Sequence, residues 1–204
     1  EMLSGDWSSD VCSSDLIQQR VLRMENLIDG ILTYSKSARA EENIQEVRIF
    51  EMIQNTIDML NATSFCKINL NENLRIETSA TKLQQVFLNL IDNAIRHNNK
   101  SLISVCISVD FYEDHLHCIV ADNGPGIEEK FHDKVFVIFQ TLKARDEFES
   151  TGIGLSIVKR IIDDCGGKIW IQSEKDQGCA FHFTWPVTSQ TICVQTQSQP
   201  EYFF

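Results

Sequence analysis

Three groups of polar residues and glycines in this chain have the types and spacing that phosphate and purine chemistry requires. In the first group, Asn89, Asn93, Arg96 and His97 lie on one stripe of a predicted helix over residues 80–97. A carboxamide oxygen is a hard neutral ligand for Mg²⁺, and arginine can pair with a phosphate. A solvated polar face of a helix would show the same spacing, so this group alone leaves both interpretations open.

The second group is the sequence DNGPGI at residues 122–127, directly after an apolar strand. Gly124 and Gly126 flank a proline, which predicts a sharp turn with an accessible backbone. Asp122, at the end of the strand, could accept a hydrogen bond from a purine amino group. An ordinary hairpin or strand–helix turn is the alternative.

The third group is the sequence TGIGL at residues 151–155, just before a predicted helix. Glycines at this point, here Gly152 and Gly154, let backbone N–H groups face a phosphate at the start of a helix. Turn chemistry alone would also explain one such pair. The three groups together, in this order, indicate phosphate and purine binding far more specifically than any one of them does.

The elements that must position these groups follow from hydrophobic periodicity. Ile17, Val21, Met24, Ile28 and Ile31 form a heptad-like seam, which predicts a helix over residues 17–38 that packs in a bundle. The charged residues 39–47 are the predicted linker, and residues 48–186 the main domain.

Within the main domain, helical and strand patterns are mixed, and the strands pair locally. Helices are predicted over residues 50–60, 80–97 (with Ser79 as the cap) and 155–162, and strands near residues 68–70, 76, 103–109, 116–120, 169–171 and 181–185. The prediction is an α/β (α+β) fold with helices on one face of a mixed, largely antiparallel sheet.

The composition narrows the classes of partner. The formal net charge of −11 repels a phosphate backbone, so nucleic acid is not an expected partner. No run is long and apolar enough to span a bilayer, and no signal peptide is recognisable, so we expect a cytoplasmic domain. Whether the parent protein is anchored in a membrane is left open. The seven cysteines show neither a CxxC pair nor metal-ligand spacing.

The two ends of the chain are expected to lie outside the fold. Residues 6–16, DWSSDVCSSDL, have no apolar period and match the translation of a read-through sequencing adapter, so we interpret residues 1–16 as an assembly artefact. A disordered Ser/Asp tail is the alternative. Residues 187–204 are rich in Thr, Gln and Ser and are predicted to be a poorly ordered tail.

Taken together, the three groups resemble the N, G1 and G2 boxes of the histidine kinase ATP-binding domain, in the superfamily of gyrase, Hsp90, histidine kinases and MutL. Phe136 and Phe139, in FHDKVFVIFQTL, resemble its F box. The resemblance covers residues 48–186 and implies a two-layer α/β sandwich that holds ATP under a lid at residues 141–150.

The resemblance also implies a role for each matching position. Asn93 would bind Mg²⁺ with Asn89 in support, Arg96 would contact phosphate, and Asp122 would bind the adenine amino group. Glycines 124 and 126 would shape the adenine pocket, and glycines 152 and 154 would close the lid. His97 is expected to be a neighbour without a role of its own. The remaining expected nucleotide contacts are Ile127, Phe139, Thr151 and Leu155.

Residues 20–36, RVLRMENLIDGILTYSK, resemble the second helix of the dimerisation and phosphotransfer hairpin of a histidine kinase. The implied partners of the parent are ATP, the phospho-acceptor hairpin, a response-regulator receiver domain and a second copy in a homodimer. None of the five histidines lies in a phospho-acceptor pattern such as S-H-E/D-L-R-x-P, so this chain is not expected to phosphorylate itself. Another ATPase or serine kinase of the superfamily, and a nucleotide-free dimerisation module, are the alternatives.

Overall fold

A computed structural model of the chain describes residues 43–112, 114–140 and 152–187, together with single helical residues between 18 and 32. The expected adapter segment, the expected lid at residues 141–150, Thr151 and the tail from residue 188 lie outside the described residues.

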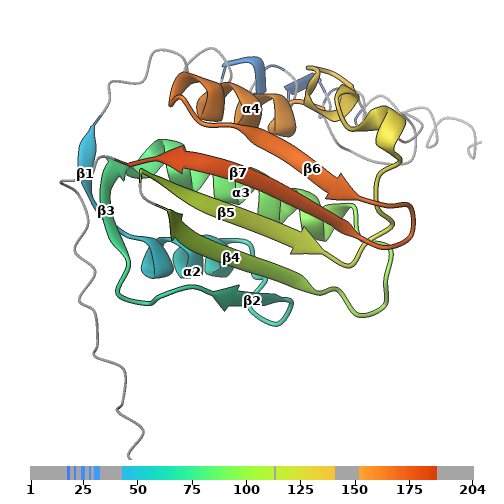
Figure 1. The fold of residues 1–204 in the computed structure, drawn as a ribbon. Helices are drawn as coiled ribbons and strands as arrows, with labels where there is room; N and C mark the ends of the chain where they lie inside the picture. Colours follow the sequence, from blue (N-terminus) through green and yellow to red (C-terminus); the bar gives the residue numbers. More distant parts are fainter. Residues whose placement is uncertain are drawn as a thin grey trace, which may run out of the picture.

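A five-stranded mixed sheet forms one layer of the fold (Figure 1). Its strand order is β2-β4-β5-β7-β6, with β2 parallel to β4 and every other pair antiparallel. The strands are β2 (Cys66–Asn69), β4 (Val105–Tyr112), β5 (His115–Asp122), β6 (Ile169–Ser173) and β7 (Cys179–Pro186). Tyr112 pairs with His115, so β4 and β5 are antiparallel neighbours joined by a tight turn, in agreement with the predicted local pairing of the strands.

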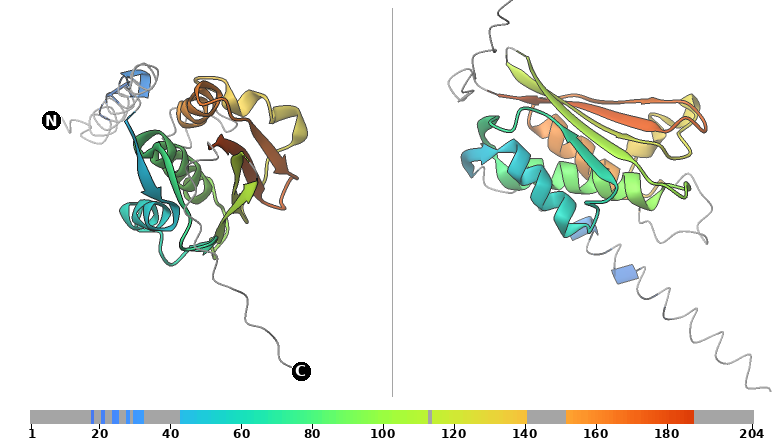
Figure 2. Two further views of the ribbon diagram at one scale, coloured as in Figure 1. Left: turned by 60° about the vertical axis from the view of Figure 1, so that its left-hand side comes forward. Right: turned by 90° about the horizontal axis from the view of Figure 1, so that it is seen from below.

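Three helices cover one face of this sheet as the second layer (Figure 2). They are α2 (Ile49–Met59), α3 (Ala80–Arg96) and α4 (Gly154–Asp164). Two short 3₁₀ turns, Glu129–Phe131 and Lys134–Phe136, lie between β5 and α4. The arrangement confirms the predicted α/β layer fold. No helix in the described part of the chain has the length and apolarity needed to cross a membrane.

The core lies between α3 and the sheet. The predicted apolar side of α3 is buried, and the Phe87 ring meets Phe183 of β7 edge-on, with 5.5 Å between ring centroids. Each large apolar side chain buried in this way contributes about 1.5–3 kcal/mol to stability. The α3 residues in this core include Leu83, Val86, Phe87, Leu90, Ile91 and Ala94.

The structure differs from the predicted elements at two places. Residues of the predicted linker form a strand, β1 (Ile44–Arg48), which pairs antiparallel with β3 (Arg75–Ser79). Only Val47 of this strand is buried, so its charged neighbours hide the strand pattern in the sequence. Ser79 does occupy the N-cap position of α3, but its side chain makes no capping hydrogen bond.

Gly30, one of the described helical residues near the N-terminus, lies beside the residue that precedes α4. Gly30 lies so close to Ile153 that a Cβ atom on Gly30 would come within 2.5 Å of the Ile153 Cδ1 atom. A residue with a Cβ atom at position 30 would therefore require the Ile153 side chain to shift. Val21, Met24 and Ile28 of the predicted seam are exposed.

One buried hydrogen bond joins segments that are 107 residues apart. The Trp185 indole N–H donates to Thr78 Oγ1 over 2.8 Å, and both side chains are buried. Thr78→Val should lower the free energy of unfolding by about 1–3 kcal/mol, because the indole N–H would stay buried without an acceptor.

Chemical denaturation would measure this change. The matched control is Thr63→Val, because the Thr63 hydroxyl donates to Asp58 at the surface. That variant should stay within about 0.5 kcal/mol of wild type. Equal effects of the two substitutions would contradict the prediction.

Candidate functional site

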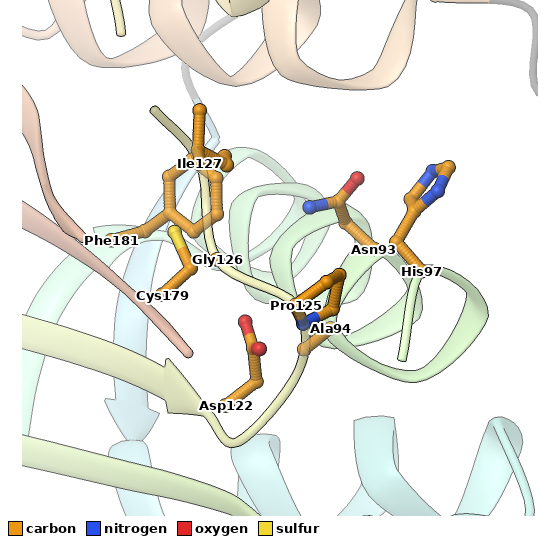
Figure 3. Close-up of a pocket in the computed structure, with 9 residues that line it drawn as sticks. All are labelled: Asn93, Ala94, His97, Asp122, Pro125, Gly126, Ile127, Cys179 and Phe181. Atoms are coloured by element: carbon orange, nitrogen blue, oxygen red, sulfur yellow. The ribbon is translucent and has the colours of Figure 1, made fainter. Parts of the chain in front are cut away.

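A pocket opens between the C-terminal half of α3, the turn after β5 and the start of β7 (Figure 3). Two of the three predicted groups contribute to its wall. The lining residues are Asn93, Ala94, His97, Asp122, Pro125, Gly126, Ile127, Cys179 and Phe181.

Asp122 is the last residue of β5, and its carboxylate points from the strand end toward the pocket (Figure 3). Burial raises the pKa of this carboxyl, and hydrogen bonds from the backbone N–H groups of Gly124 and Cys179 oppose the shift. The Gly124 N–H lies 2.7 Å from Asp122 Oδ1. The site therefore holds a partly desolvated hydrogen-bond acceptor, which interacts strongly with a ligand donor.

The β6–β7 turn holds the glycine-rich turn in place. Gly126 has a φ of +70°, and a Cβ atom there would collide with the carbonyl oxygen of Glu174, so glycine is required. The Asp176 N–H donates to the Pro125 carbonyl over 2.6 Å. The Ile127 N–H donates to Ser173 Oγ over 2.8 Å.

The sequence reasoning missed two asparagines that also hold this turn. The Asn98 Nδ2 donates to Asn123 Oδ1 over 2.9 Å, across the gap between the end of α3 and the turn after β5. Asn123 stands inside the predicted motif, but its partners come from a loop whose path the sequence does not show. No local signal would have identified this pair.

Asn93 of α3 and His97, the C-cap residue that follows this helix, both line the pocket. The Asn93 side chain makes no hydrogen bond to any residue that the structure describes, so its carboxamide is available to a ligand. His97 lies in the pocket wall beside Asn93, and the expectation that it is a neighbour without a role of its own stays a prediction. Arg96 does not line it, and its Nε donates to Asp92 over 2.7 Å.

Asn89 lies one turn before Asn93 and faces the start of α4. Its Nδ2 donates to the Gln85 carbonyl over 2.9 Å. A Cβ atom on Gly154 would come within 3.1 Å of Asn89 Oδ1. The first and third predicted groups therefore meet at this contact, where a Cβ atom at position 154 would press against the Asn89 side chain.

Phe139 and Gly152 bring the F-box and G2-box segments together. The Phe139 N–H donates to the Gly152 carbonyl over 3.0 Å, and both residues have a positive φ. A Cβ atom on Gly152 would come within 2.8 Å of the Gln140 carbonyl. Leu155 lies in α4 and packs against the core, away from the pocket wall.

The chemistry of the donor set indicates how a metal ion could be held. In the described ranges, no group of three or more His, Cys, Asp or Glu side chains could hold a metal ion. The Asn93 carboxamide offers a neutral oxygen donor in the pocket wall. Mg²⁺ is commonly held by one or two protein ligands, with substrate phosphates and waters completing the shell, and this donor set fits that mode.

Comparison with known proteins agrees with this geometry. Residues 78–189 match the family described as "Histidine kinase-, DNA gyrase B-, and HSP90-like ATPase". The chain is 31% identical to the catalytic domain of histidine kinase ThkA, with a TM-score of 0.62, and the match covers 72% of this chain and 97% of that domain.

Two relatives are longer proteins. Cyanobacterial phytochrome A of Nostoc sp. is 36% identical over 80% of this chain, and the match covers 22% of the phytochrome. Adaptive-response sensory kinase SasA of Crocosphaera subtropica is 30% identical over 80% of this chain, and the match covers 45% of SasA. This chain thus spans about a fifth to a half of these relatives.

A further structure extends the likeness toward the N-terminal helix. Histidine kinase ThkA in complex with the response regulator TrrA matches 90% of this chain at 28% identity, with a TM-score of 0.68. From these matches and the pocket, the chain belongs to the histidine kinase-, DNA gyrase B- and HSP90-like ATPase family, as the ATP-binding catalytic domain of a sensor histidine kinase.

Proposed function

We propose that this domain binds Mg·ATP in the pocket between α3 and the turn after β5, and that its parent transfers the γ-phosphoryl group to a histidine of the hairpin. The observation that carries the proposal is the Asp122 carboxylate, which is partly buried and faces the same pocket as the Asn93 carboxamide. One end of the pocket suits a purine amino group, and the other suits a metal-bound phosphate.

The adenine end of the pocket combines one polar anchor with apolar walls. The exocyclic amino group of adenine donates to a carboxylate, and Asp122 offers one. Ile127 and Phe181 supply apolar surface beside it. Ligand pockets generally bury the flat apolar part of a ligand and fix its orientation with a few polar groups. This arrangement supports adenine binding at Asp122.

The phosphate end would lie toward Asn93 and the start of α4. Asn93 would give Mg²⁺ one oxygen ligand, and the metal would neutralise phosphate charge. Gly154 is the first residue of α4, where backbone N–H groups and the helix dipole favour an anion. Asn89 would hold this end of α4 in place through its contact with Gly154. Arg96 would reach phosphate only after leaving Asp92.

The transfer itself would take place in the longer parent protein. Phosphoryl transfer needs mainly positioning and charge neutralisation from a protein, and the residues above supply both. The resemblance to a hairpin helix supports a homodimeric parent with the acceptor histidine on that hairpin. ThkA is known in complex with a response regulator. By analogy, we propose a receiver domain as the next phosphoryl acceptor.

Asn93→Ala should remove the Mg²⁺-dependent part of nucleotide binding. We expect the affinity for ATP in Mg²⁺ to fall about tenfold or more, to the value measured in EDTA, because a metal ligand is lost. Titration calorimetry with and without Mg²⁺ would measure this. Gln84→Ala is the matched control, because its carboxamide lies on the same helix but contacts Met59 of α2. An unchanged Mg²⁺ effect in Asn93→Ala would contradict the role.

Asp122→Asn should weaken ATP binding about 10- to 100-fold, since a charge-assisted hydrogen bond contributes about 1.5–3 kcal/mol. In wild type, affinity should fall as the pH drops through the raised pKa of Asp122, above the usual range of an aspartate. The variant should lack this step. A wild-type pH profile that matches the variant's would count against Asp122 as the adenine anchor.

The same carboxyl predicts an effect on stability. Folding raises the pKa of the Asp122 carboxyl, so the protonated carboxyl favours the folded state. This contribution to stability is complete below the pKa of the carboxyl in the unfolded chain, and it is lost as the pH rises through its pKa in the folded chain. At pH 7, Asp122→Asn should therefore be at least as stable as wild type while it binds ATP more weakly. Denaturation without nucleotide would check that the loss of binding is not a loss of folding.

The 204-residue chain should not phosphorylate itself, because none of its five histidines lies in a phospho-acceptor pattern. Incubation with γ-labelled ATP followed by acid and alkali treatment would measure this. An acid-labile, alkali-stable label on the chain would refute the prediction. Denatured chain is the control for carried-over nucleotide.

A further inference from the structure

We infer that Asn123, clamped by Asn98, is a positioning residue that sets the preference of this pocket for adenine over guanine through Asp122. This inference rests on the proposed binding of ATP. It concerns a residue that is not among those lining the pocket and whose side chain bonds to the segment after α3.

The Asn123 side chain makes three hydrogen bonds, all to the segment between α3 and β4. Its Oδ1 accepts from Asn98 Nδ2 and from the Ser104 N–H, each over 2.9 Å. Its Nδ2 donates to the Leu102 carbonyl over 2.8 Å. Both lone pairs of the Asn123 oxygen and one of its two N–H groups therefore take part in hydrogen bonds within the protein. The side chain thus supports the structure of the turn and does not bind a ligand.

The backbone on both sides strengthens this clamp. The Asn123 N–H donates to the Ser104 carbonyl over 3.2 Å. Asn98 is itself held, because its Oδ1 accepts from the Lys100 N–H over 2.9 Å. The Cα atom of Asn98 lies 3.6 Å from the place where a Cβ atom on Gly124 would stand. Asn98 therefore packs against the turn as well as bonding to it.

The clamp joins the two walls of the pocket. Asn98 directly follows His97, which lines the pocket from the end of α3, and Asn123 directly follows Asp122 on the other wall. The distance and angle between these walls determine where the Asp122 carboxylate stands relative to a base. No other described side chain–side chain hydrogen bond connects the residues after α3 with this turn.

The position of the carboxylate determines which purine is accepted. Adenine presents an amino donor where guanine presents a carbonyl acceptor. A well-placed carboxylate attracts the first and repels the second, and this discrimination is large in a desolvated site. Hydrogen bonds weaken steeply with angle, so a rotated carboxylate would lose discrimination before the pocket loses its apolar binding.

The experiment compares the affinities of Mg·ATP and Mg·GTP for Asn123→Ala and Asn98→Ala in the full 204-residue chain. Calorimetric titration gives the two dissociation constants, and thermal denaturation reports on folding. Asn71→Ala is the matched control, because its Oδ1 accepts from the Asn73 N–H in a loop away from the pocket. A structural defect alone would weaken both nucleotides equally and leave their ratio unchanged.

We expect the preference for ATP over GTP to fall about tenfold or more in both variants and to stay at the wild-type value in Asn71→Ala. In an Asp122→Asn background, Asn123→Ala should change the ratio no further, because its effect acts through Asp122. If Asn123→Ala does not fold, Asn98→Ala decides, since it removes only one of the three side-chain hydrogen bonds of Asn123.

Two results would overturn the inference: an unchanged ratio of the two affinities in the folded variants, or an additive effect in the Asp122→Asn background. A wild-type chain that binds ATP and GTP equally would overturn it too, while leaving ATP binding intact. A wild-type chain that binds neither nucleotide would instead refute the proposed function, on which the inference rests.

Discussion

The burial of one face of α3 against the sheet is the constraint on which the pocket depends. Phe87 and its apolar neighbours fix the rotation of the helix about its own axis, because turning it would expose them to water. With that rotation fixed, Asn93 and His97 must face the space at the end of β5. The position of the polar groups is therefore a consequence of apolar packing on the other side of the same helix.

The opposite wall of the pocket is the loop after β5, and hydrogen bonds to neighbouring segments fix its position. Pro125 and Ile127 are bonded to the β6–β7 turn, and Asn123 is bonded to the segment after α3. A binding group needs such support to keep its orientation. Burial disfavours the charged form of Asp122 and raises its pKa, while hydrogen bonds from the Gly124 and Cys179 N–H groups in this wall oppose the shift.

Most of the fold could be predicted from periodicity, because a buried face repeats every second residue in a strand and about every third or fourth in a helix. The alternation at Leu116, Cys118 and Val120 corresponds to β5, and the apolar stripe of residues 80–97 corresponds to α3. The strand β1 could not be predicted in this way, because only Val47 is buried and pairing with β3 decides its structure.

By itself, the sequence determined the family, the order of the elements and the groups around Asn93, Asp122 and the glycines, because local spacing carries all three. Only the tertiary structure decided which of these residues share one pocket. It placed His97 and Asp122 in the wall of one pocket, and it joined Asn98 to Asn123 across 25 positions of sequence. The physical reason is that such contacts depend on how the helix layer and the loops meet in space, which no local pattern of residues encodes.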